Sequence, residues 1–137
     1  MVGRLTYLID TNIWLEVLLD QEKSSDVEKF FSSIDSPHLA ITEFSLYSIG
    51  IILTRLKKGQ SFVDFISDIL ENSGVTRIRL DLADLQRIPA IQNEWNLDFD
   101  DAYQYLAAQR YDLILVSFDR DFDRTPKGRK TPSEFIS

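Results

Sequence analysis

The chain has no cysteine and a single histidine among its 137 residues. Disulfides and thiolate metal sites are therefore excluded, and zinc is disfavoured because its sites combine several Cys or His ligands. Glycine is also sparse, and the five glycines form neither a GxGxxG nor a Walker phosphate-binding motif. An absence of cysteine fits a reducing compartment, so we expect a cytoplasmic location.

Long hydrophobic runs are missing as well. No stretch approaches the roughly 20 apolar residues that a membrane-spanning helix needs. The first six residues lead directly into a strand-like segment and lack the layout of a signal peptide. We therefore expect no membrane association. Apolar residues make up 44% of the chain, and residues 1–137 are expected to form a single globular domain.

The chain has fewer basic residues than acidic ones. Lys and Arg total 15 against 22 Asp and Glu, which gives a formal net charge of −7. A chain this acidic is a poor passive binder of nucleic acid, because the phosphate backbone repels it. It is better suited to binding divalent cations or basic proteins.

Short apolar segments alternate along the chain with helical patterns. Strands are expected at 5–9, 39–41, 75–80 and 113–116, the last as a strand buried on both faces. Helices are expected at 13–18, 25–34, 43–58, 62–70, 82–95 and 99–110, with a short one after the Thr131 capping box. This alternation predicts an α/β three-layer sandwich, in which helices flank a mostly parallel central sheet. Functional groups in such folds gather beyond the carboxyl ends of the strands.

Acidic residues stand at these strand ends. Asp10 follows the first strand and Glu43 the second, Asp98 to Asp101 open the helix before the last strand, and Asp119 follows that strand. Gathered carboxylates repel one another unless a cation accepts their oxygens. Mg²⁺ and Mn²⁺ suit such ligands. The alternative for Asp10 and Asp98 is a purely structural role as helix caps.

Four segments, taken in order, resemble the PIN domain family. Leu8-Ile9-Asp10-Thr11-Asn12 is similar to the family's opening strand and acid, and Ile41-Thr42-Glu43 to its second acidic position. Asp100-Asp101-Ala102 resembles the third, and the run from Leu115 to Phe122 resembles the closing strand with its acidic turn. The resemblance covers nearly the whole chain and implies the PIN-like version of the sandwich. The small size is similar to that of VapC-type toxins of toxin–antitoxin pairs.

The resemblance implies that Asp10, Glu43, Asp101 and Asp119 are the catalytic and metal-binding acids. Asn12 and Ser117 would be polar supports beside them. Two choices between neighbours stay open. Asp100 competes with Asp101, although helix geometry turns neighbours about 100° apart so that only one can face a site well. Asp121 competes with Asp119.

A PIN domain of this kind is expected to be a Mg²⁺- or Mn²⁺-dependent endoribonuclease that hydrolyses phosphodiester bonds of an RNA substrate. The toxin-like layout implies a cognate antitoxin as partner and a homodimer. Candidate RNA-binding residues follow the last acid: Arg120, Arg124, Lys127, Arg129 and Lys130. Two alternatives remain, a catalytically silent PIN-like scaffold and a PIN nuclease of RNA processing that has no antitoxin.

Overall fold

The protein is described by a computed structural model that covers residues 4–136. Its centre is a sheet of four parallel strands, β1 (Tyr7–Ile9), β2 (Leu39–Thr42), β3 (Thr76–Ile78) and β4 (Ile114–Val116). Their order across the sheet is β3-β2-β1-β4, and every pair of neighbours is parallel. The chain thus builds outward from β1 to β3 and then returns to place β4 on the opposite side of β1.

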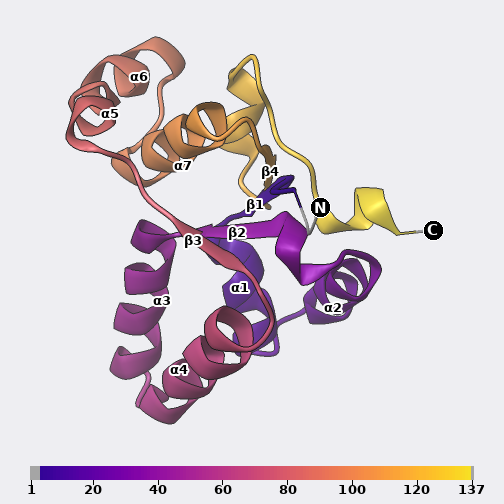
Figure 1. The fold of residues 1–137 in the computed structure, drawn as a ribbon. Helices are drawn as coiled ribbons and strands as arrows, with labels where there is room; N and C mark the ends of the chain where they lie inside the picture. The colour runs from indigo at the N-terminus through magenta and orange to yellow at the C-terminus, as the bar shows by residue number, and fades with distance from the viewer. Residues whose placement is uncertain (1–3, 137) are drawn as a thin grey trace.

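Helices cover both faces of the sheet, which confirms the α/β sandwich (Figure 1). One layer holds α1 (Thr11–Leu18), α2 (Ser24–Ser33), α3 (Glu43–Arg55) and α4 (Gly59–Phe65), and the other holds α5 (Leu82–Gln86), α6 (Ile88–Trp95) and α7 (Phe99–Arg110). Shorter helical turns complete the chain: η1 (Ser36–His38), η2 (Ile66–Glu71), η3 (Arg120–Arg124) and η4 (Pro132–Phe135). Among the described residues, no helix has the length and apolar character that would let it span a membrane.

The strands alternate their side chains between two hydrophobic cores. Leu8, Ala40 and Leu115 pack with α5 to α7, whereas Ile9 and Val116 pack with α1 to α4. Successive side chains of a strand point to opposite faces, so a sheet covered on both sides needs apolar residues at every position. This requirement explains the continuous apolar runs of the sequence.

The strand at 113–116 lies at the sheet edge as β4. It is buried on both faces at Leu115 and Val116, as expected, whereas Ile114 is 40% exposed. The structure corrects two other expected elements. The expected helix at 82–95 is two helices, because Pro89, the second residue of α6, has no amide proton with which to continue the hydrogen bonding of α5. The helix from Glu43 ends at Arg55, ahead of Gly59, and Lys57 takes the left-handed conformation (φ 60°) in the turn to α4. The capping box at Thr131 is confirmed at the start of η4.

Candidate metal centre

The candidate site lies where β1 and β4, neighbours in the sheet, reach their carboxyl ends. Ile9 pairs with Val116, and the amide of Asp10 donates to the carbonyl of Val116 over 3.0 Å. The start of α7 approaches the same point. A cavity of about 260 Å³ opens there, and Asp10, Asp101 and Asp119 all line it.

Asp10 is held rigidly at the base of the cavity and is only 6% exposed. It caps α1 by accepting from the amide of Thr11 at 2.9 Å. Its carboxylate also accepts from Gln104 Nε2 at 3.0 Å and from Ser117 Oγ at 2.7 Å. Burial raises the pKa of Asp10 in spite of these donors, and the nearby charge of Asp119 adds to the rise. The fold therefore places a carboxylate where ionisation is unfavourable without a compensating positive charge.

Asp101 shows the same conflict more strongly. Asp98 caps α7 by accepting from the Asp101 amide at 2.9 Å, which brings the Asp101 side chain to the cavity at 6% exposure. Burial raises the pKa of Asp101 to about 8, with further contributions from Asp119, Asp98 and Asp10. Among the described residues, nothing donates a hydrogen bond to its buried Oδ2. An oxygen left in this condition destabilises the fold unless a proton or a cation satisfies it, and hard cations take carboxylate oxygens. The residues present fit a divalent metal.

Asp119 and Asp121 both approach Asp101, since oxygens of the three carboxylates lie within 4.8 Å of one another. Asp121 already has a cationic partner, because its Oδ1 lies 2.5 Å from Arg124 Nη2. Asp119 lines the cavity with Asp10 and Asp101, and its carboxylate caps η3 by accepting from the Asp121 amide at 2.9 Å. The geometry favours Asp119 as the acid of the centre.

The choice between Asp100 and Asp101 follows from burial. Asp100 also lines the cavity, but its side chain is exposed at the rim. Burial and the charge of Asp98 raise its pKa. The buried and unsatisfied carboxylate is that of Asp101, which makes Asp101 the better ligand candidate.

Glu43 is not brought into this cluster. Its Oε1 lies 3.8 Å from Arg77 Nε, on the β3 side of the molecule. Glu43 is the first residue of α3, and Ser45 two positions later points in a different direction because successive helical residues turn by about 100°. Ser45, rather than Glu43, contacts Thr11 at 2.7 Å and Gln104 at 3.0 Å. Glu43 therefore does not line the cavity with Asp10, Asp101 and Asp119, and its metal-binding role stays a prediction.

Asn12 and Ser117 occupy the supporting positions expected of them. Ser117 donates to Asp10, and Asn12 Nδ2 lies 3.2 Å from Ser117 Oγ. Asn12 Oδ1 accepts from the Phe118 amide at 3.2 Å, which ties α1 to the segment after β4. Sequence reasoning missed Gln104 and Ser45. The available signals were helical spacing, since Gln104 lies one turn after Asp101, and the position of Ser45 in the first turn after the Thr42 cap.

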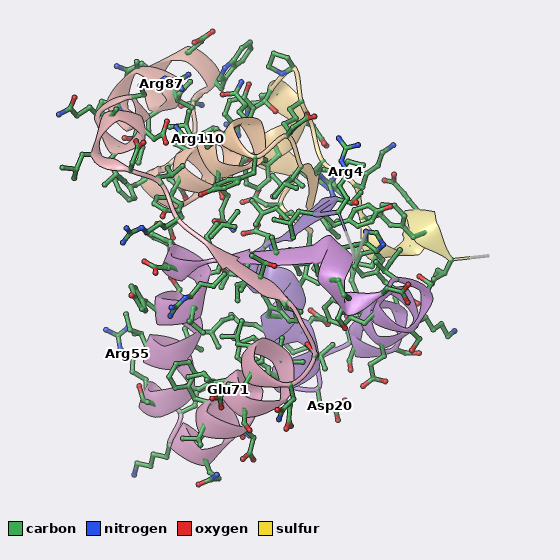
Figure 2. The ribbon with its side chains drawn as sticks, in the orientation of Figure 1. Arg4, Asp20, Arg55, Glu71, Arg87 and Arg110 are labelled. Atoms are coloured by element: carbon green, nitrogen blue, oxygen red, sulfur yellow. The ribbon has the colours of Figure 1, made fainter. Side chains whose placement is uncertain are left out.

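The basic segment after β4 is largely engaged within the protein. Arg124 pairs with Asp121, Arg129 pairs with Asp123 at 3.1 Å, and Lys130 lies 3.5 Å from Glu134. Within residues 4–136, Arg120 and Lys127 have no such ion pair. Another basic side chain, Arg55, projects outward from α3 at a distance from this segment (Figure 2).

The fold and the cavity together define an α/β domain whose acidic residues meet at the carboxyl ends of parallel strands. In agreement with this architecture, the sequence model of the PIN domain family matches residues 7–128 of the chain. The chain belongs to the PIN domain family. No curated protein matches it in sequence.

Solved structures share the fold at low sequence identity. A toxin–antitoxin complex from Klebsiella pneumoniae aligns with a TM-score of 0.72 and 21% identity, covering 93% of this chain and 98% of that one. The sarcin-ricin loop cleaving toxin VapC20 from Mycobacterium tuberculosis aligns with a TM-score of 0.72 and 15% identity, over 86% and 93% of the two chains. DNA-bound VapBC from Salmonella typhimurium aligns with a TM-score of 0.72 and 16% identity, covering 93% of this chain and 97% of that one.

Proposed function

We propose that this protein is a metal-dependent endoribonuclease and the toxin of a toxin–antitoxin pair. One observation carries the catalytic part of the proposal. Three carboxylates converge on one cavity, and one of them, Asp101, has a buried oxygen without a donor and a pKa raised to about 8. A scaffold domain gains no stability from this arrangement, because the buried carboxylates repel one another.

Asp10, Asp101 and Asp119 would hold Mg²⁺ or Mn²⁺. When bound, such a cation lowers the pKa of a coordinated water and stabilises the leaving oxygen of a phosphodiester. The chain's own groups set the geometry. Ser117 and Gln104 hold Asp10 in one orientation, the Asp98 cap fixes the first turn of α7, and Asn12 joins α1 to the turn that carries Asp119.

The test is cleavage of a labelled RNA by purified protein with Mg²⁺, with Mn²⁺ and with EDTA. We expect 5′-phosphate and 3′-hydroxyl products only when a divalent cation is present. Asp10→Asn keeps the shape of the side chain, removes its charge and should abolish cleavage. Cleavage that continues unchanged in EDTA would refute the metal-dependent mechanism.

Because the protein is acidic, RNA binding depends on basic side chains that follow the acidic residues of the cavity and are not paired with a carboxylate of the protein. Arg120 begins η3 directly after Asp119, and Lys127 lies in the following segment. Both are exposed and neither has an internal ion pair among the described residues. We infer that these two contribute most to phosphate binding within the basic segment, and that Arg124, Arg129 and Lys130 mainly stabilise it.

We further infer a cognate antitoxin and a homodimer. Two of the structural relatives named above are toxin–antitoxin assemblies, and these support the antitoxin. Support for self-association comes from α3 and its C-terminal end, where Tyr47 is 59% exposed, Ile51 50% and Leu56 51%. Neighbouring exposed apolar side chains are typical of an interaction surface. The molecular mass in solution, measured by light scattering, checks the dimer.

A further inference from the structure

A second cavity, of about 580 Å³, adjoins the cavity of the metal centre. Asn12 and Leu15 of α1 line both of them. The other walls of the second cavity are further residues of α1, the turn from Gln21 to Lys23, and Phe118 from the segment after β4. Sites for small organic groups have volumes of about 300–1,000 Å³. A polymer that passes over the metal centre can therefore place a neighbouring unit in the second cavity.

Phe118 supplies an aromatic ring to this cavity. It stands between Ser117 and Asp119 in the chain, and its amide donates to Asn12 Oδ1 at 3.2 Å. The ring is half-buried and packs partly against the core between the sheet and α1 to α4. The ammonium group of Lys23 lies over its face, 4.7 Å from the ring centroid. The backbone that carries Asp119 thus also fixes an aromatic ring beside the metal centre.

Lys23 is held in place by its backbone, and its charge has no carboxylate partner. Its amide donates to Oε2 of Glu16 at 2.5 Å, and Glu16 is only 9% exposed. Within residues 4–136, no carboxylate forms an ion pair with the Lys23 ammonium group. Aromatic rings stack on the bases of single-stranded nucleic acids, and neighbouring cations bind the phosphates. The two side chains therefore suit one nucleotide.

The surrounding charges favour this side of the metal centre for RNA. Glu16 and Glu22 also line the second cavity, and carboxylates accept hydrogen bonds, as the amino groups of bases require. The exposed aromatic ring next to the other acids is Phe99, which is 46% exposed. It stands between Asp98 and Asp100 in the chain, where a phosphate group is repelled. Phe118 is therefore the better stacking candidate.

We propose that the second cavity binds the nucleotide of single-stranded RNA next to the scissile phosphate, with the base stacked on Phe118 and a phosphate on Lys23. The inference rests on the proposed function, because it takes the metal centre as the place of cleavage. The base displaces the ammonium group from the ring, since stacking of a base on an aromatic side chain is stronger than an exposed cation–π contact. Stacking then supplies binding energy that an acidic protein cannot gain from charge.

The first test measures stacking with a short single-stranded RNA that spans a mapped cleavage site and carries 2-aminopurine at each position in turn. Ca²⁺ replaces Mn²⁺ to occupy the carboxylates without rapid cleavage. We expect the wild type to quench the fluorescence of one position next to the cleavage site. Phe118→Leu keeps an apolar side chain, should lose this quenching and should bind roughly tenfold more weakly. Phe118→Tyr keeps the ring and should retain both.

The second test measures the phosphate contact through its dependence on salt. Lys23→Gln removes the charge and keeps the backbone bond to Glu16. Loss of one phosphate contact on a single strand should lower the slope of log affinity against log salt by about 0.7. Lys29→Gln makes the same change of charge at an exposed position of α2, outside both cavities, and should leave the slope unchanged.

Each outcome decides between separate claims. Equal quenching by the wild type and Phe118→Leu, or equal salt slopes for the wild type and Lys23→Gln, would overturn the nucleotide site and leave the nuclease proposal intact. An unchanged affinity of Phe118→Leu for Mn²⁺ separates lost stacking from a displaced Asp119. If Phe118→Leu fails to fold, the wild-type quenching pattern and the Lys23→Gln slope decide the matter. A wild type that cleaves no RNA would overturn the proposed function, and the present inference with it.

Discussion

Asp10, Asp98 and Asp119 each cap a helical segment, and all three also line the acidic cavity. The interpretation of Asp10 and Asp98 as helix caps is therefore confirmed, and a cap does not exclude the functional role proposed for Asp10 and Asp119. A cap fixes the first residues of a helix relative to the preceding backbone, because the side chain accepts from amides that have no partner within the helix. The hydrogen bonds that start α1 and α7 are thus the same ones that position the carboxylates of the centre.

The stability of the metal-free protein should fall as pH rises, because of Asp101. Its pKa is about 8 in the fold, whereas an unfolded Asp titrates near about 4. Between these values the folded state keeps a proton that the unfolded state has released, so stability is full below about pH 4 and is lost as pH rises toward 8. In EDTA, we expect the wild type to melt at a lower temperature at pH 8 than at pH 5.

Asp101→Asn should reduce this pH dependence. At pH 8 in EDTA, we expect its melting temperature to exceed that of the wild type by about 4 °C, the shift that roughly 1 kcal/mol produces in a domain of this size. Asp100→Asn, at the exposed neighbouring position, is the control and should change the profile less. Saturating Mn²⁺ should stabilise the wild type and not Asp101→Asn. Identical profiles for the wild type and Asp101→Asn would show that Asp101 stays ionised in the fold.

Asp119→Asn should lower the rate of RNA cleavage far more than Asp121→Asn. Loss of residues that merely orient a ligand costs 10–100-fold, so loss of a direct ligand is expected to cost more than about 100-fold. Asp121 has its charge satisfied by Arg124 at 2.5 Å, and its substitution should cost less than about tenfold. The measurement is the rate of RNA cleavage by each variant at saturating Mn²⁺. Greater loss from Asp121→Asn would place the ion on the Asp121 side of Asp101.

At the scale of elements, Thr42 has two roles at the start of α3: it caps the helix, and it also holds Gln104, which contacts Asp10. Its buried hydroxyl accepts from the Ser45 amide and donates to Gln104. Thr42→Ala removes a helix cap and leaves the Gln104 oxygen without its donor, so we expect a loss of about 2 kcal/mol in the free energy of unfolding. Urea denaturation measures it. Thr42→Ser keeps the hydroxyl and should restore most of the stability; if it is as unstable as Thr42→Ala, the lost methyl group is responsible instead.

The elements also show how far the sequence alone can predict the molecule. Alternating strands and helices predicted the sandwich, because local periodicity reports which faces are buried. The apolar run at 113–116 did not reveal that β4 would lie at the sheet edge, because strand order depends on crossovers between distant segments. Asp10, Asp101 and Asp119 could be selected as acids at strand and helix ends. The displacement of Glu43 toward Arg77 could not be foreseen, since it depends on the helix rotation that places Ser45 against Gln104.

At the scale of the whole molecule, the net charge of −7 constrains how the protein meets both RNA and an inhibitor. The described fold concentrates negative charge at the cavity, and Arg120 follows Asp119, one of the residues lining that cavity, directly in the chain. An inhibitor gains most by inserting a cationic side chain among Asp10, Asp101 and Asp119, where it forms charge-assisted hydrogen bonds and competes with the metal. A basic partner is therefore the expected antitoxin.

Expression in a bacterial host should slow growth if the protein is a free ribonuclease, because uncontrolled RNA cleavage stops translation. Asp10→Asn should remove the toxicity while leaving the fold intact, since the variant keeps the shape of the side chain that caps α1. Co-expression of the neighbouring gene product should restore growth and give a complex that copurifies. Growth curves, together with the melting temperature of purified Asp10→Asn, are the measurements. Harmless wild-type expression with no copurifying neighbour would refute the toxin role, and RNA cleavage by the same purified protein would then favour a nuclease of RNA processing.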